Sequence, residues 1–77
     1  MNLYDLGTKL ELMDKEKNLS FYVENDRLIA TFVNREEVEV EVLTSYERQL
    51  LEKGEWTQND IERKFFELKQ IGVAGNA

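Results

Sequence analysis

The sequence predicts an α+β fold with the element order α-β-β-β-α-α. We expect a three-stranded antiparallel β-meander with an N-terminal helix and a C-terminal helical pair packed on one face. Three observations lead to this prediction: apolar residues recur at helical spacing near both ends, apolar and polar residues alternate in the middle, and turn-forming residues separate these segments. The 77 residues suffice for one domain. We assign residues 1–72 to it and residues 73–77 to a flexible C-terminal tail.

The first helix is predicted from an apolar stripe that follows Asn2. Asn2 with Asp5 three residues later is typical of a helix N-cap and an acidic first turn. The stripe consists of Leu3, Leu6, Leu10 and Met13. Inside it, Gly7 costs about 1 kcal/mol relative to alanine, so it either weakens the helix or marks a close contact with the sheet. The charged run DKEKN ends the helix and is expected to reach solvent.

Residues 19–33 are predicted to form a β-hairpin. Asn25 and Asp26 suit a two-residue turn, because both residue types tolerate the left-handed backbone region. With this turn, one face receives the apolar cross-strand pairs Val23–Leu28, Phe21–Ala30 and Leu19–Phe32. The other face receives Ser20, Tyr22, Glu24, Arg27, Ile29 and Thr31. A shift by one residue would mix the two faces, so the register is strongly specified.

A third strand is predicted where valine and glutamate alternate, in the segment EEVEVEV. We expect Asn34, Arg35 and Glu36 to form the turn before it. That turn gives the pairs Phe32–Val38, Ala30–Val40 and Leu28–Val42. The valines then join the apolar face and the glutamates join the outer face, with this strand at an edge of the sheet in the order 1-2-3.

Two further helices are predicted from their capping signatures. The capping pairs are Thr44–Glu47 and Thr57–Asp60. Gly54 and Gly72 are expected to end the two helices, and the short link through Glu55 and Trp56 predicts an antiparallel helical pair. In the last helix the apolar stripe consists of Ile61, Phe65 and Leu68.

Charge is unevenly distributed along the chain. Ten basic and sixteen acidic residues give a net charge of −6. Residues 36–62 carry nine acids and two bases, whereas residues 63–77 are net positive. A net-acidic chain repels phosphate groups, so direct binding of nucleic acid is disfavoured. We therefore expect the partner to be a protein with a basic surface.

The sequence also predicts where the protein acts. Its first residues lack the basic region and long apolar run of a signal peptide. No stretch approaches the roughly 20 consecutive apolar residues that a membrane span requires. We expect a cytoplasmic, soluble protein that makes no membrane contact.

The composition argues against an enzyme. The chain has no histidine and no cysteine, so acid–base and nucleophilic chemistry would depend on carboxylates, lysines or hydroxyls alone. The four glycines are scattered and form no phosphate-binding loop. An enzyme relying on carboxylates would need a buried pair in a cleft, which the sequence does not indicate. We expect no catalytic residues and no cofactor.

The row formed by Glu37, Glu39 and Glu41 has two interpretations. Alternate residues of a strand lie about 6.6–6.8 Å apart, too far to share one metal ion, so no metal site is expected. In the first interpretation the charges only protect a strand edge from aggregation. In the second they attract a basic groove on a partner protein, including a groove built for nucleic acid, which would make the protein a nucleic-acid mimic.

Two apolar features are candidate contact residues. Tyr22 and Ile29 are cross-strand neighbours on the outer face with charged residues around them, as in the centre of many interfaces, although such a pair is also ordinary on a solvated face. Phe66 lies about 100° around the helix from Phe65 and outside the apolar stripe. Burial of Phe66 under Trp56 and Tyr46 is favoured, and exposure at an interface is the alternative.

The function that we expect is binding of another protein, with Tyr22, Ile29, Glu37, Glu39, Glu41 and Phe66 as candidate partner-binding residues. The general profile of a short, acidic domain without catalytic motif is similar to that of many small phage and mobile-element proteins, some of which block host enzymes. This similarity rests on no specific motif and implies no residue role. The alternatives are a structural homo-oligomer that self-associates through its helices and Phe66, and an enzyme that uses carboxylates.

Overall fold

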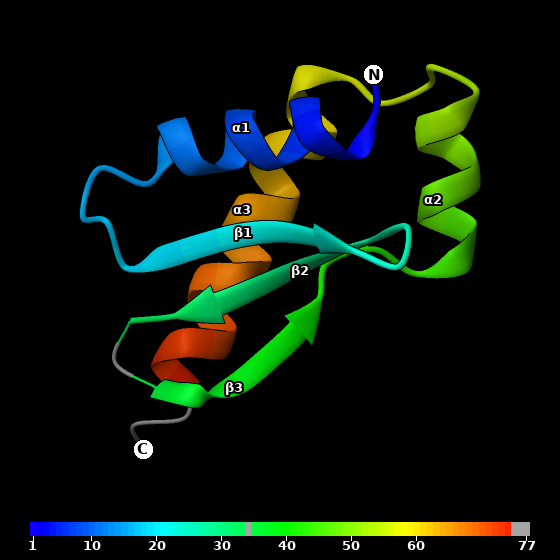
Figure 1. Ribbon diagram of the computed structural model, residues 1–77. Helices are drawn as coiled ribbons and strands as arrows, with labels where there is room; N and C mark the ends of the chain where they lie inside the picture. The colour runs from blue at the N-terminus through cyan, green and yellow to red at the C-terminus, as the bar shows by residue number, and fades with distance from the viewer. Residues whose placement is uncertain (34, 75–77) are drawn as a thin grey trace.

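The computed structural model describes residues 1–33 and 35–74, without the side chains of residues 36, 37, 73 and 74. The predicted α+β fold and its element order are confirmed (Figure 1). The elements are α1 (Leu3–Met13), β1 (Leu19–Glu24), β2 (Arg27–Phe32), β3 (Arg35–Glu41), α2 (Ser45–Glu52) and α3 (Gln58–Ala74). Among the described helices, none combines the length and apolar character needed to cross a membrane.

The molecule has a helical layer and a sheet layer. The three strands are antiparallel in the order β1-β2-β3, as predicted. Helix α1 packs against β1, β2 and α3, and α3 crosses behind the sheet (Figure 1). Helix α2 stands at the end of the sheet where the β1–β2 turn lies. One face of the sheet is therefore covered, and the opposite face carries no helix.

The register of the β1–β2 hairpin agrees with the prediction at every pair. Leu19 faces Phe32, Phe21 faces Ala30 and Val23 faces Leu28. Asn25 and Asp26 have φ angles of 52° and 62°, the left-handed conformation that a two-residue hairpin turn requires. Burial alternates along both strands, so the apolar and polar faces are separated as the pattern indicates.

The start of β3 differs from the prediction. Ala30 pairs with Val40 as expected, but Phe32 pairs with Arg35 instead of Val38, and the register shifts between Thr31 and Phe32. Arg35 and Glu36 therefore belong to the strand and not to the predicted turn, while the predicted turn residue at position 34 lies outside the described residues. The irregularity places extra residues on β3 and still leaves Val38 packed against the core.

Helix α1 begins as predicted, with the Asn2 side chain accepting a hydrogen bond from the N–H of Asp5 at 2.8 Å. Gly7 marks a close helix–sheet contact. A Cβ atom at this position would lie 3.2 Å from Cδ1 of Leu28 and 3.6 Å from Cβ of Phe21. The missing side chain thus lets the helix backbone approach the sheet, and this contact accounts for a glycine within the helix.

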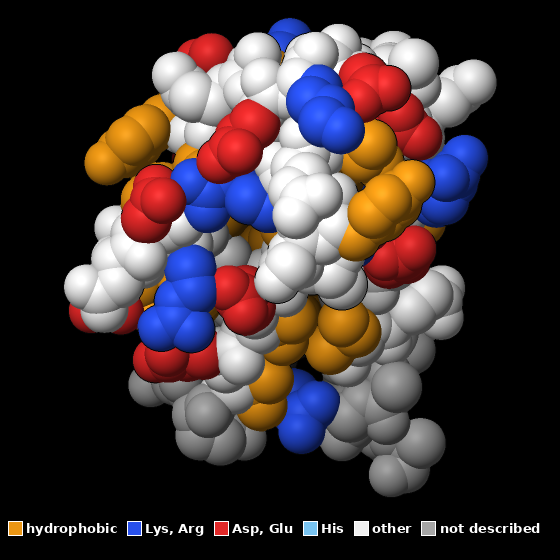
Figure 2. All heavy atoms as spheres, turned by 90° about the vertical axis from the view of Figure 1, so that its right-hand side faces the viewer, with side chains coloured by type: hydrophobic (Ala, Val, Ile, Leu, Met, Phe, Trp, Pro, Cys, Tyr) orange, Lys and Arg blue, Asp and Glu red, His pale blue; other side chains and the backbone are white. Residues whose placement is uncertain are grey.

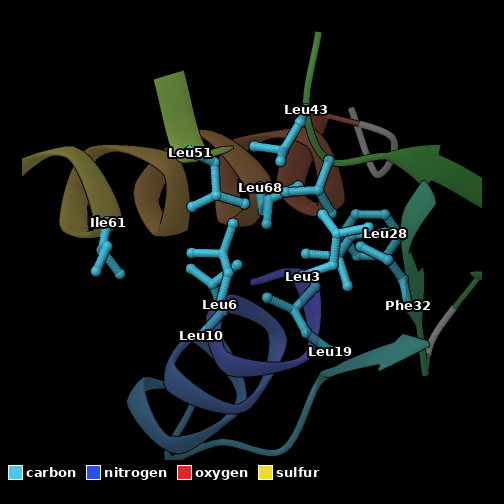
Figure 3. Close-up of a cluster of buried hydrophobic side chains, with 12 residues drawn as sticks. Leu3, Leu6, Leu10, Leu19, Leu28, Phe32, Leu43, Leu51, Ile61 and Leu68 are labelled. Atoms are coloured by element: carbon cyan, nitrogen blue, oxygen red, sulfur yellow. The ribbon is translucent and has the colours of Figure 1, made fainter. Parts of the chain in front are cut away.

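The core lies between α1, α3 and the inner face of the sheet, and its side chains converge in Figure 3. Its buried members are Leu3, Leu6, Leu10, Leu19, Leu28, Ala30, Phe32, Val42, Leu43, Leu51, Ile61 and Leu68. Phe65 and Trp56 are partly buried against this cluster. The predicted apolar stripes of both α1 and α3 thus meet the predicted apolar face of the sheet.

The capping pairs of α2 and α3 form as predicted. The N–H of Glu47 donates to Oγ1 of Thr44 at 3.1 Å, and the N–H of Thr44 donates to the Glu47 carboxylate at 2.9 Å. Thr57 and Asp60 exchange the equivalent bonds at the start of α3. The end of α3 was predicted wrongly, because the helix continues through Gly72 to Ala74. A Cβ at Gly72 would lie 3.1 Å from the Phe32 ring, so this glycine permits close packing inside the helix.

Two lysines of α3, Lys64 and Lys69, form ion pairs with the rest of the fold. Lys64, 8% exposed, lies 2.9 Å from the carboxylate of Glu47 and links α3 to α2. Partial burial would raise the pKa of Glu47, but the bonds from the Thr44 N–H and from Lys64 lower it below its ordinary value of 4.5. Asp14, 1% exposed, lies 3.3 Å from Nζ of Lys69. The expectation that the run DKEKN reaches solvent is therefore wrong for its first residue.

Candidate protein-binding site

The candidate site is the outer sheet face, which no helix covers. Tyr22 and Ile29 are directly opposed on β1 and β2, and Ile29 is opposed by Glu41 on β3. Tyr22 is 38% exposed and Ile29 is half-buried. The structure thus brings together the aromatic and aliphatic pair that the sequence indicates, on a flat surface accessible to another protein.

Tyr22 reaches across β2 to the edge strand. Its hydroxyl donates a hydrogen bond to the carboxylate of Glu39 at 3.2 Å. Partial desolvation, this hydrogen bond and the negative charges of Glu39 and Glu24 raise the pKa of Tyr22 above its ordinary value of 10.0. The phenol therefore stays neutral at physiological pH and orients one carboxylate of the acidic row.

The carboxylates on this face are only partly compensated. Glu41 lies 3.9 Å from Nε of Arg27, and both side chains are about half exposed. Such an exposed pair contributes little to stability and is readily exchanged for another partner. Within the described residues, Glu39 has Tyr22 as a hydrogen-bond partner and no basic partner. The face therefore keeps a net negative charge next to an apolar centre.

Two of the predicted site residues are not placed with the others. The side chain of Glu37 lies outside the described residues. Phe66 is 62% exposed, so the expectation that it is buried is wrong. Tyr46 does not cover it, being 69% exposed itself, and Trp56 instead donates from Nε1 to the carbonyl of Glu47 at 3.1 Å. Phe66 belongs to α3, which crosses behind the sheet (Figure 1), whereas Tyr22 is on the opposite, outer face.

The negative charge of residues 36–62 is less well balanced on the outer sheet face than on the side of the molecule where α2 lies. Figure 2 shows that basic and acidic side chains alternate there, with small groups of hydrophobic side chains between them. Ion pairs account for this alternation, since Glu47 pairs with Lys64 at 2.9 Å and Glu52 lies 3.5 Å from Arg48. Much of the negative charge of residues 36–62 is thus compensated on the helices. On the outer sheet face, by contrast, Glu39 has no basic partner among the described residues and Glu41 has only the exposed Arg27.

Other kinds of site find no support in the geometry. Among the described side chains there is no group of three or more acidic residues that could hold a metal ion. The buried carboxylate of Asp14 is occupied, because it accepts from the N–H of Leu19 at 2.7 Å and pairs with Lys69. It therefore stabilises the fold, and it does not face a second buried carboxylate as an acid–base pair would.

Sequence reasoning missed a groove of about 320 Å³ between α1 and β1. Its helical wall carries Tyr4, Thr8 and Glu11, and its strand wall includes Phe21 and Val23. The spacing of four and three residues on α1 puts the three helical residues on one stripe beside the buried one. That spacing was readable in the sequence, but nothing in it indicated that the stripe would face a strand edge.

Comparisons of the chain with protein-family models, curated proteins and solved structures found no match.

Proposed function

We propose that this protein is a non-enzymatic, cytoplasmic protein-binding module that occludes a basic surface of a larger protein. The observation that supports the proposal is the outer sheet face, where the Tyr22–Ile29 pair is accessible and Glu39 and Glu41 lie beside it. An aromatic and aliphatic centre with a charged rim is the usual composition of a protein interface. A role as an inhibitor of the phage or mobile-element type is consistent with this surface.

The mechanism that we propose is steric occlusion guided by charge. The apolar pair supplies the area that is desolvated on binding, and the carboxylates orient the partner and speed the encounter. Attraction between exposed charges fades beyond a Debye length of about 10 Å at 0.1 M salt. Binding should therefore weaken with salt mainly through a slower association rate.

The test is affinity capture from a lysate of the source cells at low and high salt, followed by mass spectrometry. The test variant changes Glu37, Glu39 and Glu41 together to glutamine. The control variant makes the same change in charge away from the sheet, at position 52 of α2, position 62 of α3 and position 55 in the link between them. Stoichiometric capture of one protein by the wild type and the control, and its loss with the test variant, would support the proposal. Equal capture by all three proteins would mean that the acidic row has no role in binding and only protects a strand edge.

A nucleic-acid mimic is a special case of this proposal. It applies if the captured protein binds nucleic acid through the same basic groove. A short nucleic-acid duplex added to the purified complex should then release this protein from its partner, and the released fraction should rise with the concentration of the duplex. A captured protein that binds nucleic acid and this protein simultaneously would contradict mimicry and leave the binding module in place.

Self-association through α3 is a second candidate function, favoured by the exposure of Phe66. Its ring is 62% exposed, and its centroid lies 5.9 Å from that of Phe65 in an edge-to-face arrangement. Analytical ultracentrifugation of wild type and Phe66→Ser tests this role. A dimer that is lost in the variant would support assembly, and a monomeric wild type would exclude it.

A further inference from the structure

The edge of β1 offers unpaired backbone groups to solvent. In the two-residue hairpin, Glu24 and Arg27 form a hydrogen-bonded pair, and such pairs alternate along an antiparallel ladder. The backbone N–H and C=O groups of Tyr22 therefore bond to β2, whereas those of Phe21 and Val23 point away from β2. In the described part of the chain, no bond from outside the sheet reaches these two N–H groups. The next outward N–H, that of Leu19, is taken by the carboxylate of Asp14.

Helix α1 runs alongside this edge and forms a groove with it (Figure 1). The helical wall consists of Tyr4, Thr8 and Glu11, all exposed, and the floor includes Gly7, whose missing side chain lets the helix lie close to the sheet. An exposed strand edge beside a helix is a general geometry for β-augmentation, in which an extended peptide adds one strand to a sheet.

The two edges of the sheet are protected differently. Strand β3 carries a register shift and alternate glutamates, both of which discourage pairing with another strand. Strand β1 has neither proline nor lysine, pairs regularly along its whole length, and has a single charged residue, Glu24. The edge of β1 is therefore the one that remains competent to pair.

Charge identifies the kind of chain that fits. Glu11 is the charged residue that lines the groove between α1 and β1, and Glu24 lies at the end of the strand. No lysine or arginine is among the described lining residues. A second copy of this protein would bring another net charge of −6 to the same acidic edge, which opposes self-pairing.

We propose that the β1 edge binds an extended peptide segment of a partner protein in which basic residues alternate with small apolar ones. The segment adds as a fourth strand next to β1, with its apolar side chains on the α1 side, against Tyr4 and Phe21, and its basic side chains on the outer face, near Glu24. This site does not include the acidic row on β3, although its lining includes Tyr22, which also belongs to the outer sheet face. The acidic row and the α1 wall of the groove can be changed separately, so either proposal can fail without the other.

The probe is a short capped peptide of alternating lysine and valine, titrated into isotopically labelled wild-type protein. Binding is monitored by two measurements, the chemical shifts of the backbone amides and their hydrogen-exchange rates. We expect exchange at the N–H groups of Phe21 and Val23 to slow by about tenfold or more at saturation, because these groups gain a bond. Exchange at Tyr22, which is already bonded to β2, should change little. The same peptide methylated on every backbone nitrogen should not bind.

Matched variants of α1 test the groove itself. Thr8→Trp fills it, whereas Leu12→Trp places the same ring on an exposed part of α1 outside the groove, where Leu12 is 73% exposed. We expect the peptide to bind Thr8→Trp about tenfold or more weakly, and Leu12→Trp like the wild type. Circular dichroism establishes that both variants are folded before the titration.

Any one of four results would overturn the proposal. The first is unchanged exchange at Phe21 and Val23 at millimolar peptide, and the second is undiminished binding of the methylated peptide. The third is slowing of exchange at the same two amides with increasing protein concentration and no peptide, which would assign the edge to a second copy. Shifts confined to Ile29 and Glu39 would also contradict the edge site, while supporting binding at the outer sheet face.

Discussion

Replacement of Asp14 by alanine should remove most of the stability of this protein. The Asp14 side chain is 1% exposed, and its two oxygens accept from the N–H of Leu19 at 2.7 Å and from Nζ of Lys69 at 3.3 Å. The variant would leave a buried N–H without an acceptor, which costs about 1–3 kcal/mol. Lys69 retains Glu16 at 3.1 Å, so the lost ion pair adds only about 0.5–1 kcal/mol.

The expected total is about 2–4 kcal/mol, against a free energy of unfolding on the order of 3–5 kcal/mol for a domain of this size. Asp14→Ala should therefore retain only about 1 kcal/mol, so roughly 15% of it should be unfolded at 25 °C in water. Asp14→Asn keeps a carbonyl oxygen for the Leu19 N–H and loses only the charge, so it should cost about 1 kcal/mol. The comparison separates the role of the acceptor from the role of the charge.

Urea unfolding followed by circular dichroism measures both variants. With an m-value of about 1 kcal/mol/M, the midpoint of Asp14→Ala should fall by about 2–4 M. A fall of less than about 1 kcal/mol in the free energy of unfolding would refute the assignment of Asp14 as a buried acceptor. Equal losses in Asp14→Ala and Asp14→Asn would instead mean that the charge, and not the hydrogen bond, stabilises the fold.

Three further predictions concern pH and packing. Because the pKa of Glu47 is lowered in the folded state, this residue stabilises the protein above its ordinary pKa of 4.5, and the contribution is lost as the pH falls through the folded value. Glu47→Gln should therefore lower the free energy of unfolding by about 1 kcal/mol at pH 7 and by much less at pH 3. Urea unfolding measures the loss, and equal losses at pH 7 and pH 3 would contradict the prediction. The free energy of unfolding of Gly7→Ala should lie within about 1 kcal/mol of the wild-type value, because better helix propensity offsets the contact at 3.2 Å with a movable Leu28 methyl group. Gly7→Leu should lower it by about 2 kcal/mol or more in the same assay. Titration of Tyr22, followed by NMR, should give a pKa above 10.0 that moves towards 10.0 in Glu39→Gln, and an unchanged value would show that their hydrogen bond is absent in solution.

The features predicted correctly from the sequence are those that local chemistry determines. The hairpin register follows from the Asn25–Asp26 turn and a period of two, and both are properties of adjacent residues. The capping pair of Thr44 and Glu47 is equally local. The opposition of Tyr22 and Ile29 on the outer face follows directly from the hairpin and was predicted with it.

The features predicted wrongly depend on how distant elements pack. The exposure of Phe66 depends on how far α3 is rotated about its own axis against the sheet. The apolar stripe containing Phe65 does not define this rotation closely, because a buried helix face is wide. The burial of Asp14 follows from the position of Lys69, 55 residues away, and a charged run gives no sign of it. Gly72 resembled a helix stop, but its role is to let the Phe32 ring approach α3.

The bond between Asp14 and Lys69 also bears on the order in which the chain folds. The hairpin closes over a two-residue turn and can form early, because little loop entropy is lost. Helix α1 packs against the hairpin strands and also against α3, whose residues follow the hairpin in the chain and are synthesised later. The part of the α1 stripe that faces α3 therefore stays exposed until α3 has been synthesised, and a nascent chain that stops before α3 exposes apolar residues that it will later bury.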